Sequence, residues 1–388
     1  MAHSVSTLLK DILSFESVTQ ELPLAEFLGQ YFQKLGVNAE IQKIPGTEGR
    51  ANIIARVGGD GSGKRVLFEG HLDVVPAAEG WTVPPFQASQ KDGRIYGRGA
   101  SDMKSGVAAM ICAAEQLLKE GYDFQNNQLV LVFVADEEVG CRGIKTFLAS
   151  DAFQGADFAV ISEPTNLEIA LCHKGSCHYK ITLYGQSAHA ATPQLGVNAL
   201  AYGARVIEAI QELAERLSRR TYPRLGGAVL SPTLISAGSC WNVIPDRCTV
   251  TVDRRLLPGE TAEDAGQELV ALLEDLKAKD PVFRYSLELV QLAEAGAITE
   301  DCEAARLGAR AYFKAFGKEA CFRGFGVTCE QAFLVHAGVP TFIFGPGDCE
   351  LCHVPDEYVL EEKLEKAAAF FCCFVKEAFQ SCAEGGRA

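Results

Sequence analysis

Residues that bind metal ions occur where apolar, strand-like segments of the chain end. His71 and Asp73 lie two residues apart in the segment RVLFEGHLDVV, residues 65–75. On an extended chain, side chains two residues apart point to the same side. A histidine that binds a metal through one ring nitrogen needs a carboxylate or carbonyl group to orient the other nitrogen, and Asp73 is placed to provide it. Taken alone, the motif is also consistent with a loop histidine beside a turn aspartate.

Asp102 lies in the glycine-rich segment GRGASDMKSG, directly before a segment with a helical pattern. Asp102 or Ser101 could serve simply as the N-cap of that helix. An aspartate cap usually needs no such glycine-rich surroundings, so we favour Asp102 as a metal ligand.

Three carboxylates, Asp136, Glu137 and Glu138, follow the apolar segment LVLVFVA. At the end of a buried strand they repel one another, so a cation must offset their charge or one of them must hold a proton. Glu137 and Glu138 are neighbours and face different directions, so one can bind a metal while the other transfers a proton. A solvated loop would explain the acidity of this segment but not its position after a strand.

Two further candidates, Glu163 in SEPT and His353 in HVPDEY, lie just before prolines. The whole set suits two zinc ions about 3.5–4 Å apart, bridged by one carboxylate and one hydroxide. Each ion would take one histidine, one glutamate and a share of the bridging aspartate, and three carboxylates with a hydroxide balance two Zn²⁺. The predicted ligands are His71, Asp102, Glu138, Glu163 and His353.

His353 also belongs to a C-x-x-C-H pattern with Cys349 and Cys352, which is typical of covalent haem attachment. Such attachment implies export, whereas segment 1–18 carries charged residues within its apolar pattern and lacks the features of a signal peptide. We therefore expect a cytoplasmic protein without haem, in which the 14 cysteines act as small buried hydrophobes.

Alternating strands and helices must position the candidate ligands. Segments 65–75, 128–138 and 158–162 are short, apolar and β-branched, as buried strands are, and 104–120 has a helical pattern. This order predicts an α/β domain with a largely parallel or mixed sheet and helices on both faces.

The pattern changes after residue 174. Segments 178–184 and 248–256 alternate like strands with one wet face, and 197–217 is an amphipathic helix, which predicts an α+β domain. The buried pattern returns at 302–316, 341–344 and 361–381.

The chain thus leaves its first domain and comes back to it. We predict a catalytic domain of residues 1–174 and 290–388, interrupted by a smaller domain of residues 175–289. The 388 residues are 48% hydrophobic and 22% charged, as in soluble globular enzymes. A net charge of −14 argues against nucleic acid or an anionic membrane as a partner, because both attract basic surfaces.

Ten segments of the chain, in order, resemble signatures of the M20 metallopeptidase family, which includes acetylornithine deacetylase and succinyl-diaminopimelate desuccinylase. They are GHLDVVP, GRGASDMKSG, DEE, SEPT, HKG, GQSAHAATPQLGVNA, NVIPD, VDRRLLPGE, FGPGD and HVPDEY. The resemblance covers essentially the whole chain. It implies a zinc-peptidase-like catalytic domain interrupted by a lid domain that usually forms a homodimer.

The resemblance also implies how the ligands are shared. One zinc ion is bound by His71, Asp102 and Glu163, and the other by Asp102, Glu138 and His353. Glu137 is similar to the family's general base, and Co²⁺ or Mn²⁺ are substitutes for zinc.

Three residues of the inserted domain resemble substrate-binding residues of the family. His189 resembles the histidine that reaches from the lid, often of the partner subunit, to the reacting carbonyl oxygen. Asn242 is similar to the lid amide near the same oxygen. Arg255 occupies the position whose guanidinium holds the substrate carboxylate, although the adjacent Arg254 could take that role.

Some residues depart from the family pattern. Cys329 and Glu330 stand where relatives usually carry Ser or Thr followed by Asp, and Trp241 is bulkier than usual and would narrow the acyl pocket. His336 lies in a helix-like apolar stretch and is predicted to be a core residue.

The expected activity is removal of an acyl group from an N-acyl amino acid, because SEPT, HKG and FGPGD resemble the deacetylase and desuccinylase branch. The alternative is a peptide bond, which would make the protein a dipeptidase or carboxypeptidase of the same family. A scaffold protein without activity should have lost a ligand or the base, and none is missing.

Overall fold

The computed structural model describes residues 4–380, which divide into two compact units. Unit 1 contains the residues up to Leu171, Ala297–Arg323 and the residues from Cys329 on. Unit 2 contains Cys172–Gly296 and Gly324–Thr328. Unit 2 therefore contains the predicted inserted domain, residues 175–289, together with residues 172–174, 290–296 and 324–328, which were predicted to belong to the catalytic domain.

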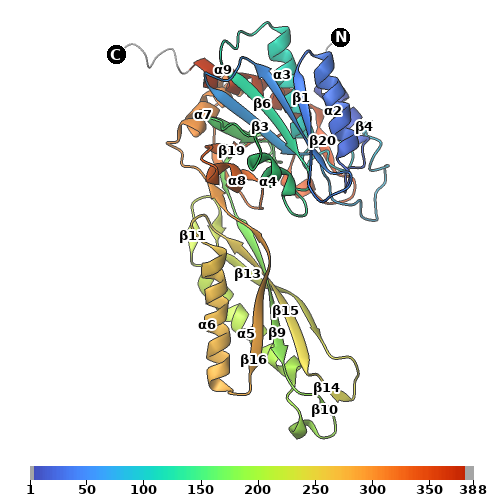
Figure 1. Ribbon diagram of the computed structural model, residues 1–388, viewed down its shortest axis with the longest axis vertical. Helices are drawn as coiled ribbons and strands as arrows, with labels where there is room; N and C mark the ends of the chain where they lie inside the picture. Colours follow the sequence, from blue (N-terminus) through green and yellow to red (C-terminus); the bar gives the residue numbers. More distant parts are fainter. Residues whose placement is uncertain (1–3, 381–388) are drawn as a thin grey trace. The chain divides into compact units, whose positions relative to one another are not determined.

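The sheet of unit 1 has the strand order β1-β2-β6-β3-β7-β19-β8-β17, with β18 beside β8 (Figure 1). The pairs of β3 with β6, of β3 with β7 and of β7 with β19 are parallel, whereas β1–β2, β2–β6 and β19–β8 are antiparallel. The prediction of a mixed sheet is confirmed. Its strands are β1 Asn38–Lys43, β2 Ala51–Gly58, β3 Arg65–His71, β6 Gln128–Val134, β7 Phe158–Ile161, β8 Ile169–His173, β17 Gly296–Ala297, β18 Phe322–Phe325 and β19 Thr341–Ile343.

Helices cover both faces of this sheet, as predicted. Successive strand residues point to opposite faces, so each face has apolar side chains that a helix can bury. Val66 and Phe68 belong to the larger core, which also contains residues of α1, α2, α3, α7 and α9. Leu67 faces the other way, into a smaller core completed by α4 and α8. The helices are α1 Val5–Leu13, α2 Leu22–Lys34, α3 Lys104–Lys119, α4 Arg142–Leu148, α7 Glu303–Phe316, α8 Gln331–His336 and α9 Glu361–Gln380.

A second, smaller sheet of unit 1 has three antiparallel strands. Strand β5 (Arg94–Tyr96) pairs with β4 (Ser89–Lys91) and with β20 (Tyr358–Leu360). The pairing joins the segment before Asp102 to the segment after His353, although the two are more than 200 residues apart in the sequence.

Unit 2 is built on an antiparallel sheet of order β13-β15-β9-β16, on which α5 and α6 pack. The inserted α+β fold is therefore confirmed. Its main elements are β9 Gly175–Tyr184, α5 Ala199–Leu217, β13 Val229–Ala237, β15 Arg247–Leu256, α6 Ala262–Lys279 and β16 Arg284–Ala293. Each helix begins at a capping side chain, since Asn198 accepts from Leu200 N and Thr261 accepts from Asp264 N.

The prediction for His336 is wrong. The residue ends the short helix α8 and is exposed, because the last turn of α8 leaves the core that Leu334 enters.

Two findings bear on the environment of the chain. No helix within residues 4–380 is long and apolar enough to cross a membrane. Every cysteine in the same range is a free thiol.

Candidate metal centre

The parallel strands β3, β6 and β7 end side by side, and each is followed by candidate ligands. His71 closes β3, Glu138 follows β6 and Glu163 follows β7. The register places His71 beside Val134 at the end of β6, so the carboxyl ends of the strands form one edge. Open α/β sheets bind their ligands at this edge.

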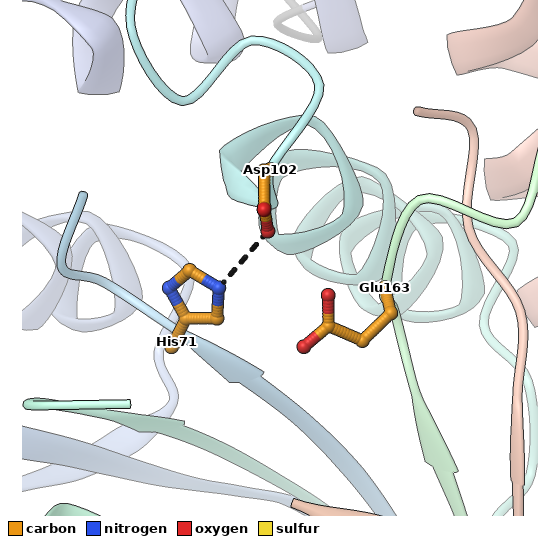
Figure 2. Close-up of side chains that lie close together, drawn as sticks. All are labelled: His71, Asp102 and Glu163. Carbon is orange, nitrogen blue, oxygen red and sulfur yellow. Dashed lines mark hydrogen bonds and ion pairs between the residues drawn. The ribbon is translucent and has the colours of Figure 1, made fainter. Parts of the chain in front are cut away.

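The ligand atoms of the predicted residues gather at this edge in overlapping groups. Within each group all atoms lie within 4.8 Å of one another, and the groups are His71–Asp102–Glu163, His71–Glu137–Glu138 and Asp102–Glu138–His353. Figure 2 shows the first group, with Asp102 at the start of α3 and Glu163 after β7 both facing His71. The five predicted ligands thus lie together, and Asp102 is shared by two groups.

Asp102 lies between the two histidines. Its Oδ1 is 3.2 Å from Nε2 of His71, and its Oδ2 is 3.3 Å from Nε2 of His353. Nε2 of His353 is also 3.0 Å from Oε1 of Glu138. Each carboxylate oxygen of Asp102 therefore faces a different histidine, which is the arrangement that a carboxylate bridging two cations requires.

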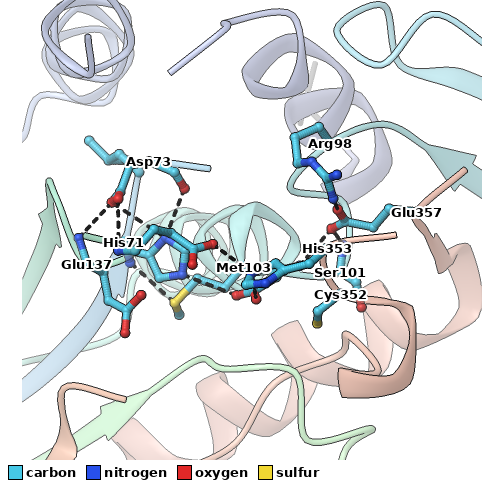
Figure 3. Close-up of polar contacts among 12 residues, drawn as sticks. His71, Asp73, Arg98, Ser101, Met103, Glu137, Cys352, His353 and Glu357 are labelled. Carbon is cyan, nitrogen blue, oxygen red and sulfur yellow. Dashed lines mark hydrogen bonds and ion pairs between the residues drawn. The ribbon is translucent and has the colours of Figure 1, made fainter. Parts of the chain in front are cut away.

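The orientation of His71 comes from the main chain. Its Nδ1 lies 2.9 Å from the carbonyl oxygen of Asp73 and 3.7 Å from the Asp73 carboxylate. That carboxylate instead accepts from the backbone N–H groups of Glu137 and Glu138 (Figure 3). Asp73 thus fixes the imidazole through its carbonyl group and the acidic loop through its side chain.

The three adjacent carboxylates after β6 have different partners. Asp136 is buried and forms a 2.6 Å ion pair with Arg142, and Arg50 lies 3.3 Å from it. Glu137 and Glu138 face the histidines instead, and Oε1 of Glu138 lies 3.0 Å from Nε2 of His353. The repulsion expected from the sequence is therefore offset by arginines at Asp136 and by a histidine at Glu138.

Burial and the crowding of charged groups change pKa values at the site. Burial raises the pKa of Glu137 and of Glu163 well above the usual range, and neighbouring carboxylates add to the effect. Burial disfavours the charged imidazole of His71, but the hydrogen bond to Asp102 and nearby carboxylates outweigh it and raise its pKa. Hydrogen bonds to Asp102 and Glu138 raise the pKa of His353 to about 10.

Such a set fits divalent cations. Two imidazoles and four carboxylates, of which His71 and Glu163 are buried and His353 is exposed, converge on one place where they compete for protons in the absence of another cation. Nitrogen and oxygen donors of this kind are the ligands of catalytic zinc.

Several charged residues at this edge gave no signal in the sequence analysis. Glu69, two residues before His71, is buried beside Glu330, and burial raises the pKa of Glu69 to about 7. Arg98 and Glu357 are buried and paired. Arg98 and Glu357 lie inside motif segments, and for Glu69 the available signal was a charged residue in an apolar strand, LFEGH.

Within unit 2, His189 and Asn242 lie together. His189 is in the two-residue strand β10 (Ala188–His189), which pairs with β14 (Val243–Ile244), and Ala190 N donates to the carbonyl oxygen of Asn242 at 2.9 Å. Trp241, beside Asn242, is 96% exposed. The paired strands β10 and β14 therefore bring a histidine, an amide and an indole together in unit 2.

The two candidate arginines differ in burial because adjacent residues of β15 point to opposite faces. Arg254 is 2% exposed and donates to Glu260. The side chain of Arg255 is 35% exposed and pairs with Asp253. Of the two, Arg255 is accessible to a ligand, whereas Arg254 ties β15 to the loop before α6.

The chain is similar to known proteins over most of its length. The model of peptidase family M20/M25/M40 matches residues 67–377. An acetylornithine deacetylase of Proteus mirabilis is 33% identical over 345 residues, which cover 87% of this chain and 84% of the relative.

Solved structures agree in fold. An M20 family metallo-carboxypeptidase of Sulfolobus solfataricus superposes with a TM-score of 0.78 at 19% identity, over 96% of this chain and 98% of the other. A dinuclear metal-binding M20 peptidase of Bacillus subtilis gives 0.73 at 18% identity, over 96% of both chains. With its family model covering most of the chain, this protein belongs to peptidase family M20/M25/M40 and is a metal-dependent hydrolase of amide bonds.

Proposed function

We propose that this protein is a two-zinc amidohydrolase that removes the acyl group from an N-acyl amino acid, as acetylornithine deacetylase and succinyl-diaminopimelate desuccinylase do. The observation that carries the proposal is the position of Asp102, whose two oxygens face His71 and His353. The identity to acetylornithine deacetylases supports the choice of substrate class. We place the enzyme in the cytoplasm, with no nucleic acid or membrane partner.

Five side chains would hold two zinc ions in this proposal. His71 and Glu163 would hold one ion, His353 and Glu138 would hold the other, and Asp102 would belong to both sets. Bound zinc supplies a Lewis acid and lowers the pKa of coordinated water towards about 7.

Glu137 acts as the general base. Its carboxylate lies in the same group of atoms as His71 and Glu138. It takes the proton of the attacking water and later gives it to the leaving amine. Burial raises the pKa of Glu137, which favours its holding that proton between the two steps.

Residues of unit 2 bind the substrate. His189 and Asn242 stabilise the carbonyl oxygen as negative charge develops on it, and Arg255 holds the carboxylate of the amino acid. The proposal includes a homodimer formed through unit 2, in which His189 serves the partner subunit's site.

The test of this function is a substrate panel assayed with zinc-loaded protein. N-acetyl and N-succinyl amino acids with a free carboxylate should be hydrolysed, and their methyl esters should be poor substrates because Arg255 would lose its partner. Preferential cleavage of dipeptides would instead support the dipeptidase or carboxypeptidase alternative. Two bound zinc ions without turnover of any member would contradict both.

Glu137→Gln separates the base from the metal ligands. The variant should bind two zinc ions like the wild type and lose turnover by a factor of at least about 10², because proton transfer by a positioned side chain contributes about 10²–10⁴. Metal content and kcat measure the two effects. Glu319→Gln, at an exposed position in unit 1, is the matched control and should keep full activity. Ordinary turnover by Glu137→Gln would rule out the assignment.

A further inference from the structure

Glu357 is a buried carboxylate that contacts the backbone beside Asp102. It is 0% exposed, and its Oε1 accepts hydrogen bonds from the N–H of Ser101 at 2.7 Å and of Asp102 at 3.0 Å. Its Oε2 accepts from Nη1 of Arg98 at 2.5 Å. Figure 3 shows Arg98, Glu357 and Ser101 in this arrangement, next to His353.

Arg98 is held as firmly as its partner. It is 1% exposed, and its guanidinium carbon lies 5.2 Å from the centroid of the Trp81 ring, a cation–π distance. A buried ion pair of this kind costs desolvation energy, so its presence is a weak argument for stability. A role in holding a particular geometry is a better explanation.

The pair joins the two loops that carry metal ligands. Glu357 follows His353 by four residues, and Arg98 precedes Asp102 by four. The same loops are joined at two more points. Gly97 N donates to the carbonyl oxygen of Glu357 at 3.0 Å, and the hydroxyl of Ser101 bonds the backbone of Asp348.

We propose that Glu357, held by Arg98, is a positioning residue of the metal centre. By accepting the N–H of Asp102 it fixes the backbone from which the bridging carboxylate points, and through its own loop it fixes the distance from Asp102 to His353. The inference rests on the proposed function, since it concerns the same ligands. We call the pair of Arg98 and Glu357 the clamp. The strongest effect is expected at the group Asp102–Glu138–His353, because the two loops that the clamp joins carry Asp102 and His353.

The experiment is a Co²⁺ titration of the metal-free full chain, followed by visible absorption and by competition with a chelator. Glu357→Gln keeps the size of the side chain but sets an amide N–H against either Arg98 or the two backbone N–H groups. The second Co²⁺ should bind about 10–100-fold more weakly, as for other residues that orient ligands, while the first should change much less. The absorption bands of the second ion should change as well.

Asp356→Asn is the matched control. Asp356 is the preceding residue of the same loop, but its carboxylate accepts from the N–H and hydroxyl of Thr82 and not from the Asp102 segment. This variant should bind both ions like the wild type. A merely structural role of Glu357 would lower the melting temperature without separating the first from the second affinity.

Wild-type affinity and spectrum in folded Glu357→Gln would overturn the inference. If that variant loses its near-ultraviolet circular dichroism, Glu357→Asp decides, because it keeps the charge but withdraws the carboxylate by one methylene. The inference requires weaker second binding there also, and wild-type binding would overturn it. A wild-type chain that fails to bind two ions would contradict the proposed function itself, whereas two ions bound equally by wild type and variant would contradict only the role of Glu357.

Discussion

In the proposed site Asp102 would serve two cations, while neighbouring carboxylates have other partners. Asp136 turns to Arg142, and Asp73 accepts two backbone N–H groups of the acidic loop. Glu137, Glu138 and Glu163 then remain near the two histidines. At the residue scale, ion pairs and backbone hydrogen bonds thus decide which carboxylates stay available to a cation.

The buried side chain of Lys104 should make the stability of the protein depend on pH. It is fully buried, and its Nζ donates to the carbonyl oxygens of Ile12 at 3.3 Å and Phe15 at 2.9 Å. Burial lowers its pKa to about 7, against the opposing effect of Glu357 and other carboxylates. Its unfolded pKa is about 10.4, so between pH 7 and 10 the unfolded state binds more protons. The contribution of Lys104 to stability therefore rises with pH in that window, by up to about 1.4 kcal/mol per unit.

Urea unfolding of the metal-free protein at pH 7, 8 and 9 measures this slope. Lys104→Met should have a lower free energy of unfolding, since two carbonyl groups lose their donor. That free energy should also increase less with pH than it does in the wild type. Lys366→Met is the control, because Lys366 is half exposed and pairs with Glu362 at the surface. Equal slopes in wild type and Lys104→Met would exclude the effect.

The elements of unit 1 meet closely where they deliver ligands. A Cβ on Gly106, in the first turn of α3, would lie 2.0 Å from Oγ of Ser162, the residue before Glu163. The start of α3 and the end of β7 can approach this far only without a side chain at that position. This close approach places the carboxylates of Asp102 and Glu163 next to the same histidine, His71.

Gly106→Ala should separate these elements. We expect a loss of about 1–3 kcal/mol in the free energy of unfolding, from overpacking, together with weaker zinc binding. Gly266→Ala, in the interior of α6, is the control. Its Cβ would have ordinary contacts with Tyr179 from 3.4 Å, so this change should stabilise by up to about 1 kcal/mol. Unchanged stability and zinc affinity in Gly106→Ala would show that the close contact of Gly106 with Ser162 is not needed to position the ligands.

Local patterns predicted the elements next to the site better than those far from it. Strand β3 begins at Arg65 as predicted, and α3 spans Lys104–Lys119 against a predicted 104–120. Both are buried and apolar, so their periodicity is strong. Strand β16 is largely exposed and was not located, because its side chains carry no alternating burial.

The clamp of Glu357 had no local signal at all. Its partner Arg98 lies 259 residues earlier, and both are charged residues in segments that look like surface loops. The burial of such a pair follows from the pairing of β5 with β20, a contact that no short window of sequence contains. In the same way, the use of the Asp73 carbonyl group in place of its carboxylate depends on where the acidic loop places its N–H groups.

For the whole molecule, the proposal divides one active site between two units. If His189 acts in the partner subunit's site, two inactive variants should restore each other. Glu137→Gln and His189→Ala, mixed under conditions of subunit exchange, should recover about a quarter of the wild-type rate, since half the dimers are mixed and one of their two sites is intact. The rate of the mixture against that of each variant alone is the measurement.

The control mixture is Glu137→Gln with Glu138→Gln. Both changes lie in unit 1, so each site of a mixed dimer keeps one defect and no activity should return. Recovery only in the first mixture supports action across the dimer. Its absence, with dimers present, would place His189 in the site of its own chain.

The position of β19 has a consequence for the order in which this protein is made. Strand β19 lies between β7 and β8 in the finished sheet, yet it is the segment Thr341–Ile343, and β7 ends at Ile161. A ribosome adding about 5–20 residues per second takes roughly 10–40 s to cover that interval. During this time the nascent chain holds a sheet with a missing inner strand, and β7 presents an open apolar edge that can pair with other chains. Unit 2, made almost entirely from one continuous stretch, can fold during that time, so we expect the uncovered edge of β7 to be the place where unfinished chains associate.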